Sequence, residues 1–232
     1  MCQFDTLSIL TLKGSIFFMI IYLLSVPNID DFEVYTEYLR FVSNERKSKI
    51  DAYKFNKNKT VSLFAELLIR YIISNDLNIS NENIIFDYNE YGKPILKDFS
   101  RYNFSISHTN NTIVFISNEL PIGIDIEKIS KGNLSLSKRF FTSNEYEHLK
   151  NSGNLDIDFF KIWTMKESYI KMLGTGLYTS LSSFDIFKPS NKYKYYNTLY
   201  GEYSISVCYQ EKDIQPIGLV PIEYNIILDY FK

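Results

Sequence analysis

The sequence predicts an α+β fold in which helices and antiparallel-looking strands occur in both halves of the chain. The first observation is a strongly apolar stretch, residues 58–74, whose large side chains recur at helical spacing. The second is a series of short alternating runs between residues 104 and 127, which is typical of strands joined by turns. The third is a helical stretch at about 156–173, which is followed by Tyr-rich alternation.

The N-terminal apolar stretch, Ser15–Val26, decides whether the chain enters a membrane. A spanning helix needs about 20 residues, which is more than this stretch offers. No A-x-A-like cleavage site follows it either, as a signal peptide would require. We therefore expect no membrane span and interpret residues 17–24 as a buried first strand. Residues 1–16 are then an extension, unless Met19 is the natural start.

The next elements are expected to be helical. Residues 30–56 combine charged side chains with spaced apolar ones, and Ser43 has the sequence context of a helix start. Residues 58–74 should form a long, mostly buried helix because their apolar side chains fall on one stripe. Tyr91–Pro94, with the sequence YGKP, predicts a turn.

The second part of the chain begins with a predicted hairpin. Asn110-Asn111 separates two apolar runs, of which residues 113–117 are the return strand, and Pro121–Glu127 supplies the next strand. Helices are expected at about 137–150 and 156–173, the latter ended by Gly174 and Gly176, and strands over about 181–230. We predict two similar halves, residues 17–118 and 119–232.

Composition narrows the functional class. Hydrophobic residues make up 45% of the 232 residues and charged residues 22%, which supports a folded core. The formal net charge of −2 gives no basic field of the kind that binds nucleic acid, so any anion site must depend on local lysines and arginines. Cys2 and Cys208 form no CxxC pair, which argues against zinc and agrees with a reducing, cytoplasmic location.

The strand Pro121–Glu127 carries the first chemical motif. Its isoleucines alternate with Gly123, Asp125 and Glu127, so both carboxylates lie on the face opposite the isoleucines. Their Cα atoms should be about 6.5–7 Å apart, which lets both acids bind one Mg²⁺ ion while Gly123 leaves room for a ligand. The alternative is a solvent-facing strand with ordinary surface acids.

The predicted helix at 156–173 adds a third acid. Trp163, Glu167 and Lys171 follow one another at steps of four and therefore share a stripe. Glu167 and Lys171 are either a surface ion pair, worth about 0.2–0.5 kcal/mol, or a metal ligand beside a lysine that stabilises phosphate or alkoxide charge.

Other polar residues are candidates for holding phosphate. Ser107 and His108 end a strand just before a turn, although a lone histidine there is often structural. No G-x-S-x-G elbow surrounds Ser107, which argues against a hydrolase triad. Arg46, Lys47 and Lys49 form a basic cluster that is either a solvated helix face or an anion site, and no P-loop or Rossmann glycine motif is present.

Taken in chain order, these motifs resemble those of the Sfp-type 4′-phosphopantetheinyl transferases. They are the basic cluster, YGKP, FSISH, PIGIDIE, RFFTSNEYE and FFKIWTMKESYIKMLGTGL, and the resemblance spans about residues 18–188. It implies two pseudo-symmetric α+β halves with coenzyme A bound between them. It also implies Mg²⁺-dependent transfer of 4′-phosphopantetheine from coenzyme A to a serine of an apo carrier protein, with release of adenosine 3′,5′-bisphosphate.

The resemblance assigns roles by position. It implies Asp125, Glu127 and Glu167 as magnesium ligands, with Glu167 also placed to take the serine proton and Lys171 to assist at the pyrophosphate. The coenzyme A contacts that it implies are Arg46, Lys49, Ser62, Lys93, Ser107, His108, Asp125, Lys166 and Lys171. Glu145 matches an acid in the carrier-facing region.

Some features depart from the family pattern or stay open. Asp51 and Ala52 stand where many relatives carry further basic residues, which bears on affinity for the 3′-phosphate. The alternatives are an inactive carrier-binding or coenzyme A-binding paralogue and a Mg²⁺-dependent nucleotide phosphatase. We expect a monomer that binds neither nucleic acid nor membrane, whereas the sequence leaves the choice among fatty acid, polyketide and peptide synthetase carriers open.

Overall fold

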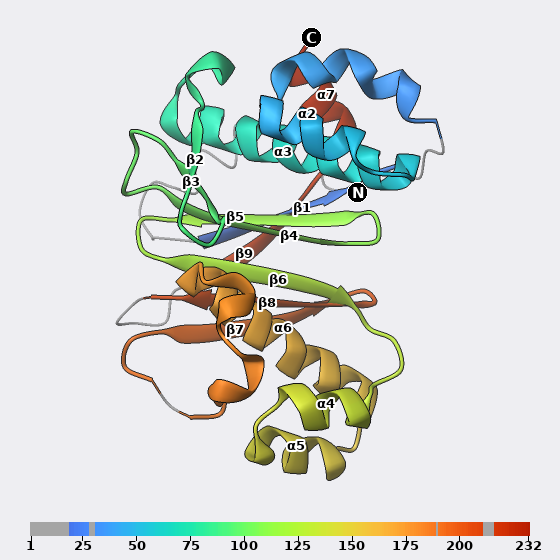
Figure 1. The fold of residues 1–232 in the computed structure, drawn as a ribbon, viewed down its shortest axis with the longest axis vertical. Coiled ribbons are helices and arrows are strands. Elements are labelled where there is room, and N and C mark those ends of the chain that lie inside the picture. The colour runs from blue at the N-terminus through green and yellow to red at the C-terminus, as the bar shows by residue number, and fades with distance from the viewer. Residues whose placement is uncertain (1–18, 28–30, 189, 211–215) are drawn as a thin grey trace.

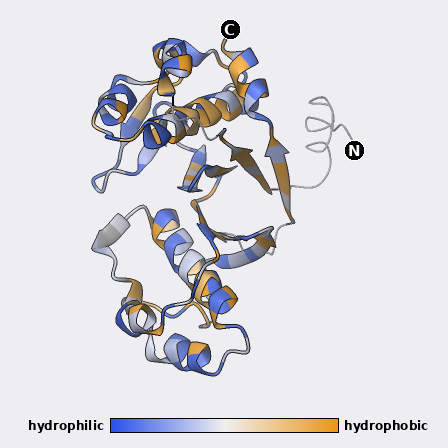
Figure 2. Cartoon of the chain, turned by 90° about the vertical axis from the view of Figure 1, so that its right-hand side faces the viewer, coloured by the Kyte–Doolittle hydropathy of each residue, from blue (hydrophilic) through white to orange (hydrophobic). Residues whose placement is uncertain are grey.

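The computed structural model describes residues 19–27, 31–188, 190–210 and 216–232. Its two larger β-sheets lie at the middle of the molecule, with one group of helices beyond each of them (Figure 1). Hydrophobic residues concentrate in the central strands and on the helix faces turned towards them (Figure 2). The α+β prediction is therefore confirmed. None of the helices in the described residues is long and apolar enough to cross a membrane.

The first sheet has the strand order β4-β5-β1-β9. Its strands are β1 (Met19–Ser25), β4 (Asn103–Thr109), β5 (Thr112–Asn118) and β9 (Ile217–Ile222). β1 confirms the predicted first strand from residue 19 onward, whereas residues 1–18 lie outside the described residues. β4 and β5 form the predicted hairpin, and Asn110 takes the left-handed conformation in its turn with φ 51°.

Helices cover one face of this sheet. They are the 3-10 helices η1 (Phe32–Phe41) and η2 (Asn81–Asn83) and the α-helices α2 (Asn44–Asp51), α3 (Asn56–Leu77) and α7 (Tyr224–Tyr230). The predicted buried helix is α3, whose apolar side chains form the centre of the first core. The Ser43 hydroxyl accepts a hydrogen bond from the Arg46 amide at 3.1 Å and starts α2, as predicted.

A short hairpin, β2 (Phe86–Tyr88) and β3 (Pro94–Leu96), extends from the first half. It contains the predicted YGKP turn. Gly92 has φ 84°, a conformation that a glycine adopts without steric cost, and its amide donates to the Asn89 carbonyl at 3.0 Å.

The second sheet has the antiparallel order β6-β8-β7 and packs against a helical layer of its own. Its strands are β6 (Ile122–Lys128), β7 (Lys194–Tyr200) and β8 (Tyr203–Tyr209), and its helices are α4 (Leu134–Phe140), α5 (Ser143–Lys150), α6 (Leu155–Leu173), η3 (Gly176–Tyr178) and η4 (Leu181–Ser183). β6 and α6 confirm two predicted elements, and Gly174 ends α6 in the left-handed conformation with φ 72°.

Two predictions for the second half of the chain were wrong. The helix expected at 137–150 is two helices, because Phe141 is extended and Thr142 starts α5 with a capping box to Glu145. The strands expected over 181–230 include β7, β8 and β9, but the chain ends in the helix α7.

The C-terminal segment also crosses back to the first half. β9 lies parallel to β1, with Ile21 opposite Leu219, and Ile227 of α7 is buried in the core formed with α3. A division into residues 17–118 and 119–232 therefore does not separate the two sheets. The final strand and helix complete the first sheet and its helical layer.

Gly123 has a different function from the expected one. A Cβ atom at this position would lie 2.0 Å from the Ser168 carbonyl oxygen of α6 and 2.3 Å from the Met172 amide nitrogen. Gly123 therefore makes room for the α6 backbone and not for a ligand. This close approach brings α6 over the face of β6 that carries Asp125 and Glu127.

Candidate active site

The candidate site forms where the first sheet meets the second. Alternate residues of β4 carry hydroxyl groups that face β6: Ser105 Oγ accepts from the Ile124 amide at 3.0 Å, and Ser107 Oγ donates to Asp125 Oδ1 at 2.8 Å. Thr109 Oγ1 donates to Glu127 Oε2 at 3.1 Å. Sequence analysis missed Ser105 and Thr109, although the alternation S-x-S-x-T opposite D-x-E was visible in the chain.

Asp125 is the centre of this cluster. Its side chain is buried, and Lys171 Nζ of α6 lies 2.7 Å from both Asp125 Oδ1 and Ser107 Oγ. The second oxygen, Asp125 Oδ2, is buried and has no hydrogen-bond partner among the described residues. A buried carboxylate oxygen without a donor is an acceptor open to a cation.

Glu127 and Glu167 lie close enough to Asp125 to interact electrostatically with it. Burial, and then the charge of Asp125, raise the pKa of Glu127 above its ordinary value. Burial and the same charge raise the pKa of Glu167, while Lys171 opposes the shift. The structure thus brings together the three predicted acids and Lys171. The described residues nevertheless contain no group of three or more His, Cys, Asp or Glu side chains already arranged to hold a metal.

A largely apolar cavity of about 320 Å³ opens beside the acids. Its walls come from the hairpin turn, from β4 and from the end of α6, and they include Tyr91, Phe104, Ile106, Glu167 and Ile170. The two predicted catalytic residues, Glu167 and Lys171, both line it. The cavity can hold an uncharged, extended group next to the charged cluster.

The predicted basic residues line two further cavities. A cavity of about 260 Å³ is lined by Arg46, Lys49 and Gly92, and another of about 420 Å³ by Ser62 and His108. Burial lowers the pKa of His108, and the positive charges of Lys171, Lys49 and Arg46 lower it further. The lowered pKa shows that these three cations act electrostatically on His108.

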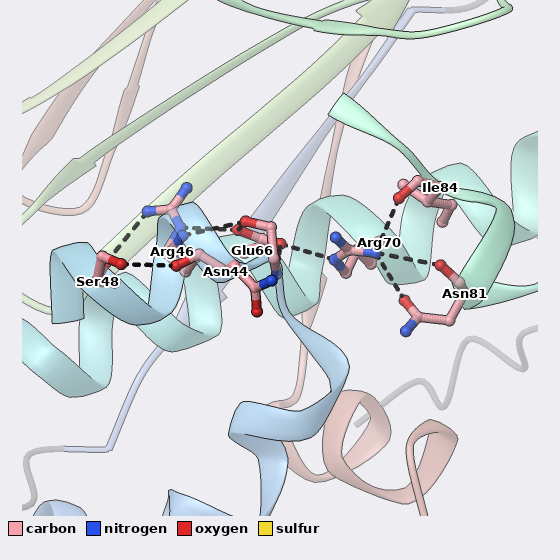
Figure 3. Close-up of polar contacts among 9 residues, drawn as sticks. Asn44, Arg46, Ser48, Glu66, Arg70, Asn81 and Ile84 are labelled. Carbon is pink, nitrogen blue, oxygen red and sulfur yellow. Dashed lines mark hydrogen bonds and ion pairs between the residues drawn. The ribbon is translucent and has the colours of Figure 1, made fainter. Parts of the chain in front are cut away.

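Arg46 is not a free cation. Its Nε donates to Glu66 Oε2 at 3.0 Å, and its Nη1 donates to Ser62 Oγ at 3.2 Å. Glu66 in turn accepts from Arg70 Nε at 2.8 Å, and Arg70 binds the carbonyl oxygens of Asn81 and Ile84 (Figure 3). The network fixes the position of Arg46 at the cavity wall.

Lys93 lies in the predicted YGKP turn, but its ammonium group binds main-chain carbonyls of the second half. Its Nζ donates to the main-chain carbonyls of Lys171 at 2.7 Å and Ile122 at 3.3 Å. Burial lowers the pKa of Lys93 to about 8. In this structure the ammonium group joins the two halves, and its expected contact with coenzyme A stays a prediction.

The expectation for Lys166 is corrected by the structure. Its side chain is completely buried, and its Nζ donates to both carboxylate oxygens of Glu145, at 2.7 and 2.6 Å, and to the Phe184 carbonyl at 2.7 Å. Neighbouring residues on a helix point in different directions, so Lys166 faces away from the side of Glu167. Glu145 is equally buried and does not present its carboxylate to a carrier.

Comparison with known proteins agrees with this geometry. A family model described as the 4′-phosphopantetheinyl transferase superfamily matches residues 121–224, and one described as the N-terminal part of 4′-phosphopantetheinyl transferase matches residues 27–120. The chain belongs to the 4′-phosphopantetheinyl transferase family. The two matches meet next to the boundary predicted near residue 119.

Individual relatives show the extent of the similarity. The chain is 42% identical to the 4′-phosphopantetheinyl transferase gsp of Aneurinibacillus migulanus, over 70% of this chain and 69% of that one. It is 34% identical to the 4′-phosphopantetheinyl transferase Sfp of Bacillus subtilis strain 168, over 64% of this chain and 67% of that one. A solved structure, the holo-[acyl-carrier-protein] synthase of Thermotoga maritima, matches 40% of this chain with a TM-score of 0.36 and 17% identity.

Proposed function

We propose that this protein transfers 4′-phosphopantetheine from coenzyme A to a serine of a carrier protein. Membership of the family supports the reaction class. The observation that carries the proposal for this chain is the junction of Asp125, Lys171 and Ser107, with Glu127 and Glu167 beside it. An inactive paralogue would have no need to keep these charged groups together in a buried seam, where each costs desolvation energy.

The distribution of charged and apolar residues over the cavities described above matches that of coenzyme A. Its phosphates would lie against the basic region that includes Arg46, Lys49 and His108, where several positive charges act together. Its uncharged pantetheine arm would occupy the apolar cavity that Phe104 and Ile106 line. The diphosphate between these two parts would then reach Lys171.

The acids are suited to Mg²⁺. Asp125 Oδ2 supplies a buried oxygen without a protein donor, and Glu127 and Glu167 supply further carboxylates nearby. Magnesium commonly uses one or two protein carboxylates and completes its shell with water and substrate phosphates, so a preformed group of three acids is not required. When bound, Mg²⁺ would neutralise charge on the diphosphate.

Glu167 and Lys171 have separate roles in this proposal. Glu167, whose raised pKa makes its carboxylate a better proton acceptor, takes the proton of the carrier serine hydroxyl as the oxygen attacks phosphorus. Lys171 donates from Nζ to the phosphate oxygens and offsets the negative charge that develops there. The leaving group is adenosine 3′,5′-bisphosphate.

Substitution of Glu167 tests its assignment as the proton acceptor. In Glu167→Gln, transfer should fall at least about 100-fold, because the amide cannot accept the proton, while some coenzyme A binding remains. The measurement is incubation with coenzyme A, Mg²⁺ and a panel of apo carriers, followed by intact mass spectrometry. Glu147→Gln, an exposed acid of α5, is the control.

The outcomes separate the alternatives. Near wild-type turnover in Glu167→Gln would refute the role of this residue. No mass gain on any carrier with the wild-type protein would favour the inactive paralogue, and free phosphate without carrier modification would favour a phosphatase. The monomeric state, the cytoplasmic location and the absence of nucleic-acid or membrane partners stay predictions.

A further inference from the structure

The hairpin β2–β3 and the end of α6 interlock, although they lie about 80 residues apart in the chain. Asn89 Nδ2 donates to the Gly174 carbonyl at 2.9 Å, across a separation of 85 residues. Lys93 Nζ donates to the Lys171 carbonyl at 2.7 Å and to the Ile122 carbonyl at the start of β6 at 3.3 Å. Two side chains of the first half therefore bind the main chain of the second.

The hairpin binds main-chain carbonyl groups at the C-terminal end of α6, where a helix has acceptors without intrahelical partners. The last four carbonyls of an α-helix have no partner within the regular helix. In α6 the Ile170 carbonyl accepts from the Gly174 amide at 2.9 Å. Lys93 supplies a donor to one of the remaining carbonyls, and a cation is favourable at a helix C-terminus. The ammonium group therefore satisfies an acceptor that would otherwise need water.

The backbone conformation of Gly174 and its closeness to the hairpin favour this contact. Its φ of 72° is left-handed, and a Cβ atom there would lie 2.9 Å from both Asn89 Nδ2 and Lys93 Cδ. The backbone conformation therefore favours glycine, and a larger residue would displace the side chains of Asn89 and Lys93.

Asn89 also organises the hairpin turn itself. Its Oδ1 accepts hydrogen bonds from the amides of Tyr91 at 3.0 Å and Lys93 at 2.8 Å. The same amide group thus holds the turn with its oxygen and the end of α6 with its nitrogen. Any displacement of the turn would be transmitted to α6.

We propose that Asn89 and Lys93 are positioning residues that clamp the C-terminal end of α6 and so fix Glu167 and Lys171 for the transfer step. Lys93 holds the carbonyl of Lys171, while the Nζ of Lys171 lies 2.7 Å from Asp125 Oδ1. Glu167 lies one turn earlier on the same helix. The inference rests on the roles proposed above for Glu167 and Lys171.

The surroundings of Lys93 support this role over direct contact with phosphate. Both of its acceptors are neutral carbonyls, and burial lowers its pKa to about 8. Lys171, by contrast, has a carboxylate oxygen, Asp125 Oδ1, 2.7 Å from its Nζ. The ammonium group of Lys93 is already engaged between two segments of the protein.

Two variants test the clamp. Lys93→Met removes both donated bonds, and Asn89→Asp keeps the oxygen that holds the turn but removes the donor to Gly174. In each, kcat should fall about 10-fold or more, since a small misplacement of catalytic groups is costly. Although Lys93 lines the cavity beside Glu167, the KM for coenzyme A should change less than about twofold, because the basic residues Arg46 and Lys49 are unchanged. Lys97→Met, an exposed lysine of the same hairpin, is the matched control and should leave both constants unchanged.

Hydrogen exchange gives a readout that does not depend on activity. Amides of residues 170–174 should exchange faster in Lys93→Met and Asn89→Asp than in the wild type, while those of α3 keep their protection. A raised KM with unchanged kcat would show that Lys93 contacts coenzyme A and would overturn the proposal. Unchanged exchange and kcat in Asn89→Asp would overturn it as well. An active Glu167→Gln would instead refute the proposed catalytic roles, whatever the exchange data show.

Discussion

Glu66, a buried carboxylate of α3, holds together the wall that carries the basic cluster. It accepts hydrogen bonds from the Ser43 amide at 2.6 Å, from Arg46 Nε at 3.0 Å and from Arg70 Nε at 2.8 Å. Burial alone would raise its pKa, but Arg70, the Ser43 amide and Arg46 together lower it below 4.5. The ionised form is therefore the one that the fold stabilises.

Glu66→Gln should consequently destabilise the protein by about 3 kcal/mol at pH 7, because two guanidinium groups lose their counter-charge. The folded-state pKa lies below the ordinary value of 4.5, so the carboxylate contributes fully above pH 4.5 and loses its contribution as the pH falls further. Urea unfolding at several pH values should show the gap between variant and wild type closing below pH 4.5. Glu37→Gln, an exposed acid, is the control; a gap that is constant with pH would contradict the assignment.

At the residue scale, spacing was sufficient to place Asp125 and Glu127 on one face of a strand and Glu167 on a helix. Their role as magnesium ligands came from the family resemblance and stays a prediction. The partners of Lys93 and Lys166 could not be predicted, because both lysines bind groups that are distant in the chain. Lys166 and Glu167 are neighbours in sequence, yet one faces a buried acid and the other the cleft.

At the element scale, the pair Lys166–Glu145 joins α6 to α5 inside the second half. Both side chains have no exposed surface, and Glu145 also closes the capping box with Thr142 and accepts from the Ile186 amide at 2.8 Å. Lys166→Met should cost about 3–5 kcal/mol, since it leaves a buried carboxylate without its cation. Replacing Glu145 by Gln in the same chain should recover part of that loss.

The affinity for coenzyme A distinguishes this structural role from a cofactor contact. Lys166→Met, measured by calorimetry under conditions where it is folded, should bind coenzyme A as tightly as the wild type, because the side chain does not reach the cleft. Lys161→Met, an exposed lysine of the same helix, controls for the loss of charge. A large loss of affinity in the Lys166 variant alone would restore the expectation from the family resemblance.

The prediction of elements succeeded where side-chain periodicity was strong and failed at the junctions. α3, α6 and the β4–β5 hairpin followed from spacing and turn residues. The break between α4 and α5 was missed although T-x-x-E at Thr142 is a capping signal. The 3-10 conformation of η1 over ten residues was also missed, because 3-10 runs of that length are uncommon.

At the scale of the whole molecule, the two ends of the chain are tied together. β9 lies parallel to β1, and α7 packs into the first core through Ile227 and Leu228, followed by Phe231 at its C-terminal end. Pairing between strands almost 200 residues apart leaves no local signal in the sequence, which is why the division at residue 118 did not anticipate it. The core between the sheets, with Ile124 and Val114 completely buried, joins the halves a second time.

This double connection predicts that the two halves unfold together. Ile227→Ala creates a cavity in the first half and should cost about 3 kcal/mol. Trp163, the chain's single tryptophan, lies in the second half against Phe140, Phe141 and Phe159, so its fluorescence reports on that half. In urea, the fluorescence midpoint and the far-ultraviolet circular dichroism midpoint should therefore fall by the same amount.

The neighbouring residue offers a matched control. Ile226 is 43% exposed whereas Ile227 is completely buried, so Ile226→Ala should change stability by less than about 0.5 kcal/mol. If Ile227→Ala lowered the circular dichroism midpoint but left the Trp163 transition in place, the halves would be independent folding units. The seam between β4 and β6, which positions Ser107 against Asp125, would then have to form by docking of two folded parts. A shared shift instead means that the seam between β4 and β6 and the rest of the fold unfold in one cooperative transition.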